Sequence, residues 1–187
     1  MITLDEIRDS LPDYARDLSL NLGSVLAPTG APGLTPTQIW AVALASAVTS
    51  GNAAFTRDIE SLASAHLEPG YVKAAAAAAA IMGMNNVYYR FVHLVGDADY
   101  AQMPARLRMN VIGNPGISRP DFELLCLAVS AINGCGACIE SHEKQLRQSG
   151  FSREALQSAV RIAATVHAVA RVLENPLAAQ PGAVKAA

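Results

Sequence analysis

The sequence predicts an all-α fold in a single domain. Residues of high helix propensity dominate, and the segment 74–80 consists entirely of alanine. Two Thr-x-x-Glu/Gln sequences, beginning at Thr3 and Thr35, fit the reciprocal capping box that starts a helix. No stretch combines the alternation typical of a strand with turn residues at both ends. With 187 residues, the chain is long enough to bury one sizeable core.

The first half of the chain is expected to contain five helices. Thr3 pairs with Glu6 in the first capping box, and Thr35 pairs with Gln38 in the second. Pro36 then occupies the first helical position, where its missing N–H costs nothing. The predicted helices of this half cover 3–10, 12–24, 36–50, 53–66 and 71–94.

The second half is expected to contain four more helices. The sequence GNPGIS at 113–118 is the clearest internal loop, Gly150 ends one helix, and Ser152 caps the next. Residues 175–187 lack apolar periodicity, so we expect a flexible tail after a helical domain over 1–174. The predicted helices of this half cover 98–107, 119–133, 135–149 and 152–173.

One internal echo would divide the domain into two similar halves. AIMGMNNV (80–87) and AINGCGAC (131–138) share Ala, Ile and Gly at matching places, and Met84 and Val87 stand where Cys135 and Cys138 stand. If the echo marks a duplication, only the second copy carries chemistry. A chance match between two Ala-rich helices is the alternative.

Composition excludes some classes of function. Charged residues make up 16% of the chain, the formal net charge is -2, and no dense run of Lys or Arg is present to neutralise phosphates. Nucleic acid is therefore not an expected partner. The opening MITLDEIRDS is unlike a secretory leader, and the weakly polar segment 74–84 is far shorter than the ~20 residues that cross a bilayer. We expect a cytoplasmic protein without a membrane anchor.

The sequence SAINGCGACIESHE (130–143) carries the strongest chemical signal. Cys135 and Cys138 lie on one face of the first turn of a predicted helix, close enough to form and release a disulfide. Unpaired N–H groups and the helix dipole stabilise an anion there, which favours the nucleophilic thiolate. In a reducing compartment, such a pair indicates catalysis, redox activity or metal binding rather than a structural bridge.

Two further side chains complete a proton relay by geometry. His142 lies one turn beyond Cys138 on the same face of the helix. If the chain forms a helical hairpin about Gly134, Glu123 lies about 16 Å before the bend and His142 about 12 Å after it. A long carboxylate side chain covers that difference, which predicts the order Glu123, His142, Cys138.

Other readings of these residues remain open. Structural zinc would have three ligands from the same segment, with Cys126 or Glu123 as a distant fourth, although a second Cys-x-x-Cys or His pair is missing. Attachment of haem would require His directly after the second cysteine, where Ile139 stands. Cys126 is interpreted as core packing. The larger aromatic side chains are best explained by core or subunit contacts, and they are Trp40, Tyr71, Tyr88 and Tyr89.

Four segments together resemble the alkyl hydroperoxide reductase D (AhpD) family, within the carboxymuconolactone decarboxylase-like superfamily. These segments are LPDYARDLSLNL (11–22), AAIMGMNNVYYR (79–90), LRMNVIGNPGI (107–117) and DFELLCLAVSAINGCGACIESHE (121–143). The similarity extends over most of the chain. The separations of the Glu, Cys-x-x-Cys and His residues are specific to this pattern rather than generic.

The resemblance implies an antioxidant, all-helical homotrimer that reduces alkyl hydroperoxides and passes electrons to the peroxiredoxin AhpC. It implies no bound cofactor and no metal. Reducing equivalents would come from dihydrolipoamide on a 2-oxo acid dehydrogenase component, kept reduced by lipoamide dehydrogenase. By position, Cys138 would attack the peroxide and become the sulfenic acid, and Cys135 would donate a proton and resolve it as the Cys135–Cys138 disulfide. Glu123 and His142 would form the relay.

One departure from the family pattern is visible between the two cysteines. A relative has a Ser-His pair there, whereas this chain has Gly136 and Ala137, so any scheme that routes protons through the extra imidazole is weakened. Two other functions stay open: a zinc-binding or redox-adaptor module without peroxidase activity, and a cysteine-independent lyase of the same superfamily.

Overall fold

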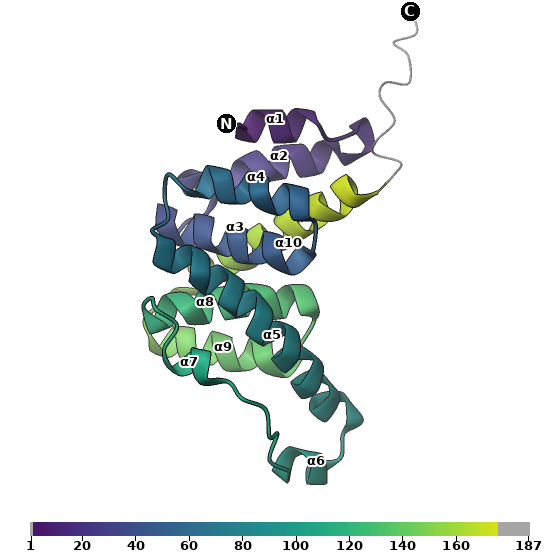
Figure 1. The fold of residues 1–187 in the computed structure, drawn as a ribbon, viewed down its shortest axis with the longest axis vertical. Helices are drawn as coiled ribbons and strands as arrows, with labels where there is room; N and C mark the ends of the chain where they lie inside the picture. The colour runs from purple at the N-terminus through teal and green to yellow at the C-terminus, as the bar shows by residue number, and fades with distance from the viewer. Residues whose placement is uncertain (1, 176–187) are drawn as a thin grey trace, which may run out of the picture.

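Helices form the whole framework in residues 2–175, the part of the chain that the computed structural model describes, and no strand occurs there (Figure 1). Two short 3-10 turns, at Asp13–Ala15 and Pro28–Gly30, join the first helices. The α-helices are α1 (Leu4–Asp9), α2 (Arg16–Val25), α3 (Pro36–Ser50), α4 (Ala53–Ala63), α5 (Pro69–Val95), α6 (Ala98–Gln102), α7 (Asn110–Gly113), α8 (Arg119–Asn133), α9 (Gly136–Gln148) and α10 (Arg153–Glu174). The all-α prediction is therefore confirmed.

The predicted helix starts agree well with the structure. Both capping boxes are present, and Ser152 caps α10 by accepting a hydrogen bond from the Ala155 N–H. The helix expected over 98–107 is wrong in its second half, because α6 ends at Gln102. Met103 is extended there, as the residue before a proline tends to be. The short helix α7 lies between this point and the predicted loop and was not expected.

Two helices, α3 and α8, form the centre of the molecule. Each has an unbroken run of buried residues, 41–47 in α3 and 122–130 in α8. A helix that is apolar on all sides must be enclosed by other helices. Accordingly, α3 packs against α4, α5, α8 and α10, and α8 packs against α3, α5, α9 and α10. In Figure 1, α1, α2, α3, α4 and α10 lie toward one end, while α5 runs diagonally past α8 and α9 and carries α6 at its far end.

The helices repeat as a unit of central helix, tight turn, shorter helix and long helix. Counterparts in the units α3–α4–α5 and α8–α9–α10 lie 83 residues apart: Gly51 and Gly134 are both left-handed, and Asn52 and Cys135 both cap the helix that follows. The two similar halves are thus present, but the register suggested by the echo is wrong. Residues 80–87 lie inside the continuous helix α5, whereas 131–138 span a helix end and a helix start.

A polar cluster fixes the start of α8 against two other helices. Asp121 accepts hydrogen bonds from Gln38 Nε2 on α3 and from the Tyr71 hydroxyl on α5, each at 2.7 Å. Burial, followed by this hydrogen bond, raises the pKa of Tyr71 to about 12. Tyr71 therefore remains a donor, and α8 is anchored at the end opposite Gly134.

Two further expectations concern a membrane-spanning helix and the C-terminal tail. Within residues 2–175, none of the helices combines the length and apolar character needed to cross a bilayer. Helix α10 ends at Glu174. Apart from Asn175, the tail expected over 175–187 lies outside the described residues.

Candidate redox site

The turn between α8 and α9 sets the position of both cysteines. Gly134 has φ 68°, a left-handed conformation that glycine adopts without a Cβ penalty. The chain reverses there, and Cys135 becomes the N-cap of α9 in an extended conformation. Its sulfur accepts a hydrogen bond from the Cys138 N–H at 3.3 Å. The predicted hairpin and the predicted helix start are therefore both present.

Cys135 and Cys138 are joined as a disulfide across the first turn of α9, with their Cα atoms 5.3 Å apart. The two sulfurs differ in environment. Cys135 is fully buried, whereas Cys138 is 7% exposed and lines a pocket. A small molecule that enters this pocket therefore meets Cys138 first.

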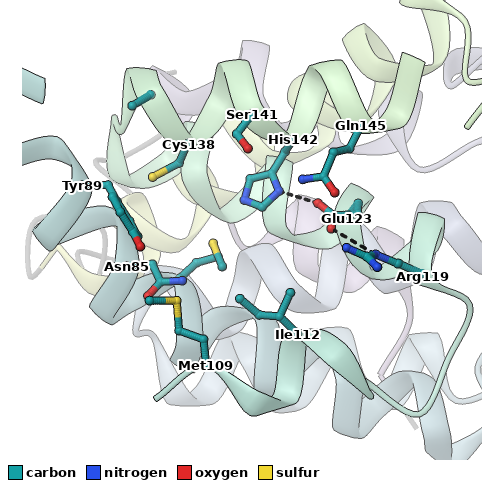
Figure 2. Close-up of a pocket in the computed structure, with 12 residues that line it drawn as sticks. Asn85, Tyr89, Met109, Ile112, Arg119, Glu123, Cys138, Ser141, His142 and Gln145 are labelled. Carbon is teal, nitrogen blue, oxygen red and sulfur yellow. Dashed lines mark hydrogen bonds and ion pairs between the residues drawn. The ribbon is translucent and has the colours of Figure 1, made fainter. Parts of the chain in front are cut away.

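Glu123 and His142 meet across the hairpin. His142 Nδ1 lies 2.6 Å from Glu123 Oε2, and both side chains are buried. With Nδ1–H donating to the carboxylate, the second ring nitrogen keeps its lone pair and acts as a proton acceptor. Figure 2 shows the imidazole between Glu123 and the Cys138 side of the pocket. The contact that the hairpin argument expected is thus present.

A third charged group reaches the carboxylate from the pocket rim. Arg119 Nε lies 4.0 Å from Glu123 Oε1, and the Arg119 side chain is largely exposed. A solvated ion pair of this kind contributes little to stability. It does place a cation beside the anionic end of the Glu123–His142 pair.

The pocket itself has a volume of about 290 Å³ and a mostly apolar lining. Its walls come from α5, α7, α8 and α9. That size suits a small molecule or the end of a flexible chain rather than a large cofactor. The twelve lining residues are Met82, Asn85, Tyr89, Met109, Ile112, Arg119, Glu123, Ala137, Cys138, Ser141, His142 and Gln145.

The wall of this pocket that α5 and α7 form was not expected from the sequence. Asn85 and Tyr89 on α5, with Met109 and Ile112 at α7, lie across the pocket from Cys138 and His142 in Figure 2. Tyr89, for which a core or subunit contact was expected, lines the pocket wall. The only available signal was that these residues lie in AAIMGMNNVYYR and LRMNVIGNPGI, two of the segments that carry the family resemblance.

Cys126 stands apart from this chemistry. It is buried on α8 and makes no disulfide, which agrees with its interpretation as a residue of the packed core. Burial, reinforced by the negative charge of Glu123, raises the pKa of the Cys126 thiol far above its ordinary range. Among residues 2–175, no three His, Cys, Asp or Glu side chains are grouped in a way that could hold a metal ion.

Comparisons with known proteins identify the family. The family model for the Carboxymuconolactone decarboxylase family matches residues 98–179. The alkyl hydroperoxide reductase AhpD of Rhodospirillum centenum is 53% identical over the full length of both chains. The proteins of the same name from Gluconacetobacter diazotrophicus and Streptomyces avermitilis are 55% and 50% identical, over 95% and 92% of this chain and 96% of each relative. The chain therefore belongs to the alkyl hydroperoxide reductase AhpD family.

Proposed function

We propose that this protein is a thiol-dependent alkyl hydroperoxide reductase that cycles between the Cys135–Cys138 dithiol and its disulfide. One observation carries the proposal: the sulfur of Cys138 lies at a small, mostly apolar pocket that also contains the buried His142–Glu123 pair. The name shared by the relatives agrees with it. An apolar lining suits the alkyl group of an organic hydroperoxide.

The oxidative half-reaction begins on Cys138. The thiolate attacks the terminal oxygen of R–O–O–H, an S–O bond forms, and the O–O bond breaks. Sulfur loses two electrons and becomes the sulfenic acid, while the peroxide is reduced to an alkoxide. Before the attack, His142, oriented by Glu123, takes the proton of the Cys138 thiol, and its imidazolium then delivers that proton to the alkoxide, which becomes the alcohol.

Cys135 then resolves the intermediate and a dithiol restores the enzyme. The sulfur of Cys135 attacks the sulfenic acid, the disulfide forms, and the hydroxyl group leaves as water after taking the Cys135 proton. Dihydrolipoamide, held on a 2-oxo acid dehydrogenase component and regenerated by lipoamide dehydrogenase, reopens the disulfide by exchange and is itself oxidised to the cyclic disulfide. In the reducing cytoplasm, the reduced cysteine pair also passes electrons to a second acceptor, an AhpC-type peroxiredoxin.

Peroxide turnover with dihydrolipoamide as the donor tests this proposal. We expect the wild-type protein to consume cumene hydroperoxide, with and without the peroxiredoxin. Cys138→Ser should abolish consumption, whereas Cys135→Ser should permit a single oxidation, trapped as a sulfenic acid by dimedone. Full turnover by Cys138→Ser would overturn the proposal. Stoichiometric zinc with no titratable thiols in protein purified without chelator would instead favour the metal-binding module.

A further inference from the structure

Asn85 on α5 has a buried side-chain oxygen that accepts no hydrogen bond. Within residues 2–175, its Oδ1 is the only buried side-chain nitrogen or oxygen atom without a partner, and Asn85 is 4% exposed. Asn86, its neighbour in the chain, is fully satisfied: its Nδ2 donates to Ser130 Oγ at 2.9 Å, and its Oδ1 accepts from Asn133 Nδ2 at 3.0 Å. Position 85 therefore carries an acceptor that the fold itself does not use.

An unpaired buried acceptor lowers stability, because water is removed from it and nothing replaces the lost hydrogen bond. An apolar side chain of similar size would pack at this position without that cost. A hydrogen-bond donor for the Asn85 side-chain oxygen must therefore come from outside the folded chain. The location of Asn85 indicates what that partner is.

Asn85 lies on the wall of the pocket opposite α9. Figure 2 shows it on the α5 side, with Cys138 and His142 projecting from α9 across the cavity. Its neighbours on this wall include Met82 and Met109, which offer no O–H or N–H donor. Tyr89 on the same wall carries a hydroxyl group, but among residues 2–175 Asn85 Oδ1 is the buried acceptor without a partner, and it lines the pocket of the reactive sulfur.

We propose that Asn85 Oδ1 binds the hydroperoxide by accepting a hydrogen bond from its O–H group. This inference rests on the proposed peroxide reductase function and names a residue that orients the substrate. The oxygen that carries this hydrogen is the terminal one, which Cys138 attacks. The hydrogen bond turns that oxygen toward α9 and leaves the alkyl group against the methionine side chains.

The chemistry of the step is consistent with this role. As the S–O bond forms and the O–O bond breaks, the hydrogen held by Asn85 stays on the oxygen transferred to sulfur, which becomes S–O–H. The alkoxide takes its proton separately, from His142. The other substrate of the cycle, a dithiol, presents S–H groups, which are weak donors. The acceptor is therefore matched to the peroxide rather than to the dithiol.

Separate measurement of the half-reactions tests the inference. Asn85→Leu and the smaller Asn85→Ala are compared with wild type, and Asn21→Leu, an exposed position on α2, is the matched control. We expect both Asn85 variants to lower the second-order rate constant for oxidation by cumene hydroperoxide by about three- to tenfold, the factor that one neutral hydrogen bond contributes. Reduction of the disulfide by dihydrolipoamide should stay within twofold of wild type.

A reagent without O–H or N–H groups separates substrate binding from the reactivity of the sulfur. Methyl methanethiosulfonate should modify Cys138 at the same rate in the Asn85 variants and in wild type. An equal loss of rate with this reagent and with the peroxide would overturn the inference, as would unchanged oxidation by peroxide or a loss confined to dihydrolipoamide. If wild type itself is not oxidised by the peroxide, it is the proposed function that fails.

Discussion

At the scale of single residues, the site depends on a buried carboxylate that the fold alone would not favour. Glu123 is 4% exposed within the most apolar part of α8. A buried charge is costly unless it is paired and hydrogen-bonded, and His142 supplies that pairing at 2.6 Å. Placing Glu123 in the core is therefore understandable as a means of holding the imidazole in one orientation and one tautomer.

Glu123→Gln tests whether the charge of this carboxylate matters. Glutamine keeps an acceptor for the His142 N–H but no longer stabilises a protonated imidazole. We expect the rate of Cys138 oxidation by hydroperoxide to fall by about 100-fold, near the lower end of typical general acid–base contributions. Stopped-flow measurement of the peroxide half-reaction, followed across pH 5–9, checks this.

Glu140→Gln is the matched control for that variant, because Glu140 lies on α9 but is exposed. It should oxidise at the wild-type rate. A Glu123→Gln protein that reacts as fast as this control would show that the contact between Glu123 and His142 is only structural.

Cys126 should remain unreactive while the protein is folded. Its pKa is raised by burial first and by Glu123 second, so the thiolate is scarce at neutral pH. In the reduced protein, iodoacetamide should label Cys138 quickly, because Cys138 lines the pocket, and Cys126 only after unfolding. Because the shift is upward, raising the pH from 7 to 9 should not start Cys126 labelling. Mass spectrometry of the native protein at each pH provides the measurement, and prompt labelling of Cys126 would contradict the prediction.

At the scale of helices, the repeated unit explains where the site lies. The two central helices end in left-handed glycines, and each turn feeds a capped helix. In the first unit, the positions that correspond to Cys138 and His142 are Phe55 and Ile59, which are fully buried in the core. One copy of the turn therefore serves packing, and the other carries the reactive groups.

The repeat supplies a matched pair of variants, Gly134→Ala and Gly51→Ala. A Cβ added at either glycine would meet no atom within 4 Å, so the cost is that of a left-handed alanine alone. We expect each variant to lose about 1 kcal/mol, or about 2–4 °C in Tm. Differential scanning calorimetry measures this loss.

Only Gly134→Ala should change the redox cycle, because Cys135 follows it directly and caps α9. Its disulfide should close more slowly after oxidation, which dimedone trapping of the sulfenic acid would detect. Equal trapping in both variants would show that the turn does not position Cys135.

Much of this architecture could be predicted from the sequence, because local signals determine it. Thr35 and Gln38 placed the start of α3, and Gly134 placed the hairpin that joins Glu123 to His142. The pocket wall could not be predicted in the same way. Asn85 and Tyr89 reach the site only because α5 crosses α8 and α9, a tertiary contact with no local signature. The repeat of α3–α4–α5 in α8–α9–α10 was not visible in the sequence, because the second unit has Cys138 and His142 where the first has the packing residues Phe55 and Ile59.

At the scale of the whole molecule, an apolar surface is left uncovered. The C-terminal part of α5 extends beyond the other helices to α6 (Figure 1), and its outer residues are strongly exposed. Large contiguous apolar patches on a protein surface mark interaction sites. The exposed side chains of this arm are Val87, Phe91, Leu94, Val95, Tyr100 and Met103.

We propose that this arm is the contact through which three copies of the chain associate, as the family resemblance led us to expect. A closed ring requires the arm of each copy to rest on a different surface of the next, so that no arm stays exposed. Sedimentation equilibrium should then give a mass three times the 19.6 kDa of one chain.

Leu94→Glu tests the contact directly, because Leu94, at 73%, is the most exposed of these six side chains. A charge placed in an apolar interface has no partner there, so association should weaken and the single-chain mass should appear. Leu20→Glu on α2, at a position 55% exposed, is the matched control and should leave the assembly intact. Glu123, Cys138 and His142 lie on α8 and α9 rather than on the arm, so the dissociated variant should still react with peroxide in a single turnover. A Leu94→Glu protein that retains the full mass would show that the arm serves another purpose.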